Sequence, residues 1–303
     1  MSELDPTILL NASLAQAQSA PVAAETPART ALSSPVPPHA SHSSEPIHTT
    51  VITPPSGWQL INVTELWKFR ELLGFLIWRD VKVRYKQTLL GAAWAILQPA
   101  MMMVVFTIFF SRIANVPAGD LPYPIFVYAG LLPWTFFSTS IAQAAASVVG
   151  SERRITKIYF PRLSIPFASV GAAVVDFAIA FGLLLVLMLW YRVMPGPQML
   201  LVPVLFVFLA LAATGVGTLL AALNVAYRDF RYVVPFLVQL WMFATPSIYM
   251  NAAANGRGQL DWVLIINPLS PIIQSFRAAV LGGPIPWNSL TLAACISVGM
   301  FFA

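Results

Sequence analysis

The sequence predicts an all-α polytopic membrane protein with six transmembrane helices, an N-terminal interfacial helix, and re-entrant outer helices between spans five and six. Two observations carry this fold class. The 303 residues are 58% hydrophobic and only 10% charged, with a mean hydropathy of +0.74, which a soluble domain of this size does not tolerate on its surface. The apolar residues also form long stretches separated by polar loops. A lipid bilayer is therefore the expected solvent for most of the chain.

Charge and cysteine content exclude several other classes. The net charge of +5 is spread among several loops rather than gathered on one face, so nucleic acid is not an expected partner. The single cysteine, Cys295, lies in an apolar run, which leaves neither a disulfide framework nor a thiolate metal site. The chain carries three histidines, at positions 39, 42 and 48, without an acidic or thiol partner nearby. No metal site is predicted.

Residues 1–56 form the first predicted domain, a disordered cytoplasmic tail. They contain no aromatic residue and are rich in proline, serine, alanine and threonine, so they bury too little apolar area to fold. Residues 57–88 follow as an amphipathic interfacial helix, in which apolar residues recur at helical spacing, namely Leu66, Phe69, Leu73, Leu76 and Ile77. Phe75 and Trp78 widen its apolar face. We expect this helix to lie along the membrane surface.

Residues 89–303 form the third predicted domain, which contains the six spans. Five apolar stretches occupy roughly 91–114, 125–149, 166–191, 200–222 and 234–250, and most reach the roughly 20 residues that a bilayer requires. A sixth begins near 289 and is still apolar at Ala303, which predicts that the chain is truncated. Between spans five and six, an apolar segment is broken by Pro268, Pro271 and a Gly282-Gly283-Pro284 turn. Either two re-entrant outer helices or an ordinary packed loop fits this pattern.

Basic loop residues set the predicted orientation. Twelve lysines and arginines precede the first span or follow the second and fourth, against four on the opposite side, which are Arg112, Arg192, Arg257 and Arg277. The positive-inside rule places the richer side in the cytoplasm. We therefore expect a multi-pass protein of the inner membrane with a cytoplasmic N-terminus.

The sequence lacks the motifs of an enzyme or an ATP-binding protein. No lysine follows a glycine, so a phosphate-binding P-loop is not present. Neither a zinc-protease motif nor a Gly-x-Ser-x-Gly turn occurs, and no catalytic residue is predicted. If the chain moves a substrate against a gradient, its energy source lies on another polypeptide.

Polar and aromatic residues inside the spans are candidates for a translocation path. Asp176 lies within the third span, where an unpaired carboxylate costs on the order of 3 kcal/mol or more. It serves either an interhelix hydrogen bond or transport. Aromatic side chains gather towards the outer ends of the second and fifth spans, at Trp134, Phe136, Phe137 and Tyr249 among others. Such rings line a sugar path or form the core and interfacial belt, and both interpretations stay open.

A cytoplasmic segment between the second and third spans is a candidate docking element. Basic residues surround an apolar Tyr-Phe-Pro step there, in the set Arg153, Arg154, Lys157, Tyr159, Phe160, Pro161 and Arg162. A short amphipathic element of this kind suits coupling to a soluble ATPase subunit. A basic loop that serves only topology is the alternative.

Several runs along the chain resemble the type 2 ABC exporter permeases for polysaccharides and polyol phosphates. The run from Arg84 to Trp94, continued by Leu97-Gln98-Pro99, resembles the start of that family's first span. Later runs are similar to its second span, coupling segment, third span, second cytoplasmic loop, fifth span and outer gate, at residues 130–137, 157–162, 175–177, 224–229, 235–249 and 267–277. The resemblance covers about residues 58–303 in order.

This resemblance implies a specific assembly. The chain would be one half of a homodimer, joined to two nucleotide-binding ATPase subunits that hold ATP and Mg, with no cofactor on the chain itself. The dimer would form a channel for a lipid-linked glycan such as an O-antigen, capsule or teichoic-type polymer. By the same resemblance, Phe276 and Arg277 belong to the outer gate, and Tyr227, Arg228 and Asp229 form a second contact with the ATPase. Gln274 departs from a glutamate that is common in relatives.

Other functions fit less well. An ABC exporter permease for a small hydrophobic drug or lipid is the main alternative, although such permeases more often carry a large outer loop or a fused ATPase. A membrane glycosyl transferase needs a metal-binding acidic pair or a nucleotide site, and neither is visible in the sequence. A secondary transporter is expected to show inverted repeats and more buried charge.

Overall fold

The computed structural model describes residues 67–86, 93–113, 121–151, 161–245 and 267–302. The chain divides into two compact units, Met1–Pro54 and Pro55–Ala303, and every described residue belongs to the second. The predicted tail at 1–56 therefore lies outside the described residues. The division of residues 57–303 into two domains stays a prediction.

The described part of the chain consists of helices and the turns between them, without a strand, which confirms the predicted fold class at the level of an all-α membrane protein. Short helices accompany the long ones: a π-helix η1 (Ile108–Ile113) and the 3₁₀ helices η2 (Val149–Ser151) and η3 (Pro197–Leu201). The α-helices are α3 (Arg70–Lys86), α4 (Ala93–Thr107), α5 (Tyr123–Ser147), α7 (Ser164–Trp190), α8 (Val202–Ala226), α9 (Phe230–Ala244), α11 (Leu269–Leu281) and α12 (Trp287–Phe302).

Among the described residues, four helical segments are long and apolar enough to cross a membrane. They are Ala93–Phe110, Tyr123–Ser147, Ser164–Trp190 and Pro197–Ala226, and they match the first four predicted spans. The fifth predicted span begins within α9, and its remainder after residue 245 lies outside the described residues. The segments α9, α11 and α12 are shorter apolar helices. The count of six spans and the re-entrant geometry around α11 stay predictions.

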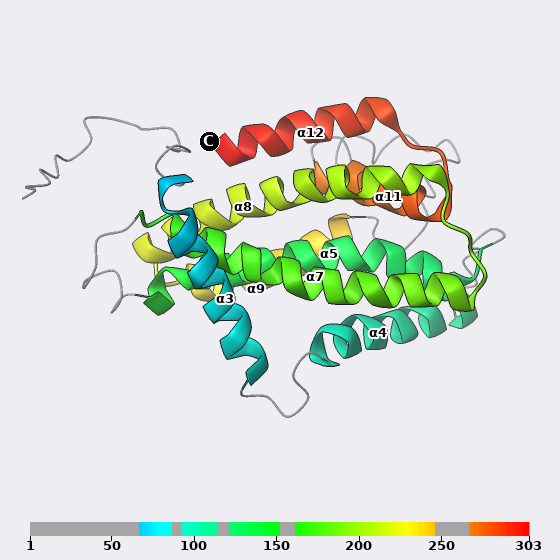
Figure 1. The fold of residues 1–303 in the computed structure, drawn as a ribbon, viewed down its shortest axis with the longest axis horizontal. Helices are drawn as coiled ribbons and strands as arrows, with labels where there is room; N and C mark the ends of the chain where they lie inside the picture. The colour runs from blue at the N-terminus through cyan, green and yellow to red at the C-terminus, as the bar shows by residue number, and fades with distance from the viewer. Residues whose placement is uncertain (1–66, 87–92, 114–120, 152–160, 246–266, 303) are drawn as a thin grey trace, which may run out of the picture. The chain divides into compact units, whose positions relative to one another are not determined.

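Helix α5 forms the centre of the bundle. It packs against α4, α7, α8, α9 and α11, and most of its side chains are buried (Figure 1). A helix that is apolar on all sides is expected in such a central position. Tyr128 stays compatible with this burial because its hydroxyl donates a hydrogen bond to the Ala180 carbonyl of α7, at 2.9 Å. The hydroxyl thereby ties α5 to α7.

Two glycines allow α8 to approach its neighbours closely. A Cβ atom on Gly215 would lie 2.3 Å from the carbonyl oxygen of Met300 in α12. A Cβ atom on Gly217 would lie 2.7 Å from the Cβ atom of Ala144 in α5. Small residues commonly occupy helix contacts inside membranes, where van der Waals packing rather than the hydrophobic effect drives association. The α8 contacts with α5 and α12 therefore require glycine at these two positions, because a side chain would push the helices apart.

Helix α3 packs across α7 at a steep angle (Figure 1). Leu76 is buried in this contact, and the Ile77 side chain lies against Gly171 of α7. Phe75 and Trp78 are 64% and 67% exposed, so the part of the apolar surface of α3 that they form is not covered by the described helices. Its position along the membrane surface stays a prediction.

Candidate functional site

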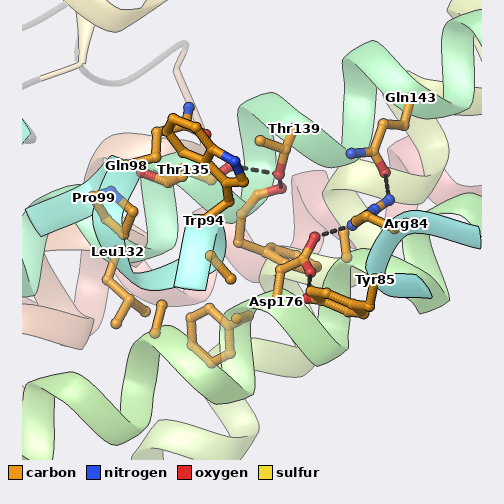
Figure 2. A pocket seen from close by; sticks show the side chains of 15 residues that line it. Arg84, Tyr85, Trp94, Gln98, Pro99, Leu132, Thr135, Thr139, Gln143 and Asp176 are labelled. Atoms are coloured by element: carbon orange, nitrogen blue, oxygen red, sulfur yellow. Dashed lines mark hydrogen bonds and ion pairs between the residues drawn. The ribbon is translucent and has the colours of Figure 1, made fainter. Parts of the chain in front are cut away.

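A cavity lies between α3, α4, α5 and α7 (Figure 2). Its volume is about 220 Å³. Apolar and aromatic side chains form one part of the lining, and hydroxyl, amide and charged side chains form the other. The lining residues are Arg84, Tyr85, Trp94, Ala95, Gln98, Pro99, Leu132, Thr135, Phe136, Thr139, Gln143, Ala173, Asp176, Phe177 and Ala180.

Asp176 is the centre of a hydrogen-bond network on one side of the cavity (Figure 2). Its carboxylate accepts hydrogen bonds from the Arg84 guanidinium and from the Tyr85 hydroxyl, both on α3. Arg84 also donates to the side-chain carbonyl of Gln143 on α5. Asp176 lies 12 residues after Ser164 at the start of α7, which is about 18 Å along the helix at about 1.5 Å per residue. The network thus joins three helices near the middle of α7.

This network offsets the cost of a carboxylate in an apolar helix. The Asp176 and Arg84 side chains are 25% and 29% exposed, so both groups are partly withdrawn from solvent. An opposite charge together with hydrogen bonds is the usual solution for ionisable groups at this depth. The structure therefore supplies the interhelix bonds that one of the two predicted roles of Asp176 requires. Its role in transport stays a prediction.

Tyr85 acts in this network as a hydrogen-bond donor. Burial, followed by the hydrogen bond to Asp176, raises the pKa of its hydroxyl above the ordinary value for tyrosine. The hydroxyl therefore stays protonated at neutral pH and directs its proton to the carboxylate.

The α5 side of the cavity presents oxygen atoms as acceptors. The Thr135 hydroxyl donates to the Leu131 carbonyl at 2.8 Å, and the Thr139 hydroxyl donates to the Thr135 carbonyl at 2.7 Å. Each hydroxyl has one proton, so a threonine oxygen that already donates within its helix can only accept a further hydrogen bond. Both threonines line the cavity.

The aromatic residues proposed for a translocation path lie in different surroundings. Phe136 lines the cavity, and its ring packs edge-on against Phe177 of α7 with centroids 5.6 Å apart. Trp134 and Phe137 are buried in the core, where Phe137 packs edge-on against Trp241 of α9. Neither of them belongs to the cavity lining. Tyr249 lies outside the described residues.

The predicted gate residues of α11 are also in the core. Phe276 is 1% exposed and packs edge-on against Phe177 and Phe181. The Arg277 guanidinium lies 4.1 Å from the centroid of the Phe126 ring, a cation–π contact. Neither residue lines the cavity, although Phe276 contacts Phe177, which does.

The two predicted ATPase contacts are only partly described. Residues 153, 154, 157, 159 and 160 lie outside the described residues, whereas Pro161 and Arg162 stand just before α7. Arg162 is exposed. Tyr227, Arg228 and Asp229 form the exposed connection between α8 and α9. These positions are accessible to a partner, and their coupling role stays a prediction.

Sequence reasoning missed three members of the cavity network as site residues, namely Arg84, Tyr85 and Gln143. Asp176 itself was the available signal, because a carboxylate in an apolar span requires a partner. Arg84 and Tyr85 are polar residues at the end of the helix that precedes the first span, which made them reachable partners. In the described part of the chain, no three histidine, cysteine or acidic residues gather as a metal site. The absence of a bound metal stays a prediction.

Comparison with known proteins shows the family. The sequence model of the ABC-2 type transporter family matches residues 71–281. The chain belongs to this family of membrane transporters. It is therefore a multi-pass membrane protein and a transport component rather than an enzyme.

Curated relatives match most of the chain. It is 31% identical over 244 residues to the O-antigen export system permease protein RfbA of Myxococcus xanthus, covering 80% of this chain and 92% of the relative. It is 25% identical over 223 residues to RfbA of Klebsiella pneumoniae, covering 73% and 85%. The polysialic acid transport protein KpsM of Escherichia coli is 25% identical over 215 residues, covering 69% of this chain and 80% of the relative.

Proposed function

We propose that this chain is the membrane-spanning permease subunit of an ATP-driven exporter that moves a lipid-linked polysaccharide from the cytoplasm across the inner membrane. The similarity to the O-antigen export permease of M. xanthus over 92% of that protein's length carries the proposal. A second polysaccharide transport protein, KpsM, is similar over 80% of its length. The names of these relatives thus all refer to the transport of a glycan.

A separate ATPase supplies the energy in this proposal. The full sequence has no Gly-Lys step and so no P-loop. The docking surface would combine the segment from Arg153 to Arg162 with the exposed connection of Tyr227, Arg228 and Asp229. ATP and Mg bind the ATPase, and closure of the ATPase dimer moves these cytoplasmic elements.

Two copies of the chain form the channel in this proposal. Helix α4 and helix α9 expose large apolar side chains along their lengths, including Met101 and Val105 on α4 and Phe236 and Phe243 on α9, which are 56%, 58%, 63% and 69% exposed. A second copy, together with lipid, covers such surfaces. The orientation with a cytoplasmic N-terminus follows from the basic loops.

Deletion of the gene tests the substrate. A strain without this chain should accumulate undecorated glycan inside the cell and lose it from the surface, and the wild-type chain should restore export. Normal surface glycan in the deletion strain would contradict the proposal. Loss of drug or lipid efflux with normal glycan would instead support the alternative substrate class.

Charge reversal tests the docking segment. Replacing Arg153 and Arg154 with glutamate should abolish export while the chain still accumulates in the membrane, because like charges then face the partner. Reversal of Arg192, a basic residue of the predicted outer side, serves as the matched control. Full export by the Arg153→Glu, Arg154→Glu variant would remove this segment from the docking surface.

A further inference from the structure

We propose that the cavity between α3, α4, α5 and α7 binds one neutral sugar ring. This inference rests on the proposed function, because the ring would belong to the exported glycan or its lipid-linked end. It assigns the ligand class of a cavity for which neither the family match nor the relatives' names give a role. Its size, its aromatic walls and the polarity of its lining each point to this ligand.

The size of the cavity suits a single ring. A cavity of about 150 Å³ in a protein core is known to hold benzene, a bare six-membered ring. The cavity beside Asp176 is about 220 Å³, so it has room for a six-membered ring together with its hydroxyl groups.

Aromatic side chains supply flat apolar walls. Phe136 and Phe177 stand nearly perpendicular, with an interplanar angle of 72°, and both line the cavity. Trp94 of α4 lines it from another helix and is 51% exposed. Aromatic faces carry partial negative charge and attract weakly positive C–H groups. The C–H face of a sugar ring fits an exposed aromatic face, which Trp94 offers, since Phe177 is already stacked on Phe206 with ring centroids 4.3 Å apart.

The polar part of the lining offers both acceptors and donors, and the donors are the N–H groups of Arg84, Trp94, Gln98 and Gln143. The Asp176 carboxylate has about four lone-pair sites, of which Arg84 and Tyr85 use two. The oxygens of Thr135 and Thr139 can only accept, because their protons are donated within α5. A lining with both kinds of group favours a ligand with many hydroxyl groups, because a hydroxyl both donates and accepts, and such groups define a sugar.

Two other ligand classes fit this lining poorly. The charged lining residues are Arg84 and Asp176, which offset one another, so an anionic phosphate gains little attraction and meets the carboxylate. A wholly apolar ligand would offer no donor to the threonine oxygens or to the remaining lone pairs of the carboxylate, at a cost in desolvation. A neutral, hydroxyl-rich ring avoids both penalties.

Saturation-transfer NMR tests this assignment on the purified full chain in phosphatidylcholine nanodiscs, without sugar-headed detergents. The probes are methyl α-hexopyranosides, with glucose 1-phosphate and cyclohexanol for comparison. Empty nanodiscs correct for binding to lipid. The variants Gln98→Leu and Thr139→Val each remove one polar group from the lining. Valine also keeps the shape of the threonine side chain. Gln239→Leu on α9 and Thr218→Val on α8 are the matched controls, because neither residue lines the cavity.

The expected result is saturation transfer to at least one neutral hexoside, reduced at least fivefold in Gln98→Leu and Thr139→Val and unchanged in the two control variants. Thermal unfolding confirms that each variant is folded. Equal signals from all variants would overturn the assignment, as would a stronger signal from the sugar phosphate or no signal from any hexoside. The export phenotype of the deletion strain is independent of this binding signal, so failure of either proposal is recognised separately.

Discussion

The contacts of α8 and the contacts of α3 hold the bundle together by different means. Helix α8 meets α5 and α12 through glycines, with backbone atoms in close approach. Helix α3 packs Leu76 and Ile77 on α7 and adds a second kind of contact, polar side chains that bind Asp176 of α7 and Gln143 of α5. The first kind of contact tolerates almost no added volume, whereas the second depends on charge and hydrogen bonding. The difference indicates a rigid centre and a separately attached α3.

The largest effect is expected at Gly215. Replacement by alanine places a Cβ atom 2.3 Å from the Met300 carbonyl oxygen, so the backbones of α8 and α12 must separate. Overpacking of this kind costs about 1–3 kcal/mol, and we expect a clear fall in the unfolding temperature. Gly182→Ala on α7 is the control, because its Cβ atom meets nothing within 4 Å. Equal unfolding temperatures for the two variants would contradict the claim that close backbone contacts of α8 hold the centre of the bundle.

A smaller effect is expected at Asp176. The Asp176→Ala variant leaves the Arg84 guanidinium without its carboxylate, at a cost of about 1–3 kcal/mol. Because the pair attaches α3, hydrogen exchange of the α3 amides should accelerate at least tenfold, with little change in α5. A double-mutant cycle with Arg84→Ala should show coupling between the two residues. Asp80→Ala is the control, since Asp80 pairs with Arg79 inside α3 itself.

The Tyr85→Phe variant removes one bond of the same network. The ring keeps its packing while the hydrogen bond to Asp176 is lost, with a net cost of about 0.5–1.5 kcal/mol. Exchange of the α3 amides should rise less than in Asp176→Ala. If the two variants accelerated exchange equally, the ion pair with Arg84 would have no separate part in holding α3.

The smallest effect is expected at Asn224, which supplies a single polar contact within the rigid centre. Its side-chain amide donates to the Ala145 carbonyl of α5, at 2.8 Å. Hydrogen bonds between helices in membranes average about 0.6 kcal/mol. Asn224→Ala should therefore lower the unfolding temperature slightly, and much less than Gly215→Ala. A larger loss than at Gly215 would show that polar contacts, rather than shape, hold α8.

The sequence predicted the first four spans well, because hydropathy alone separates a long apolar helix from a polar loop. It also identified Asp176 as a residue in need of a partner. It did not show that Trp134 and Phe137 face the core while Phe136 faces the cavity, since all three lie on a helix that is apolar all round and shows no distinct face. The crossing of α3 over α7 depends on tertiary packing, so its Arg84 and Tyr85 contacts were not predicted.

Reconstituted transport tests the central claim most directly. Vesicles that contain this chain and its partner ATPase are supplied with lipid-linked polysaccharide and ATP on the ATPase side. The account predicts that glycan appears on the opposite side, detected by a lectin that does not cross the membrane, only when chain, ATPase and ATP are all present. Glycan that appears equally without this chain, or without ATP, would contradict it.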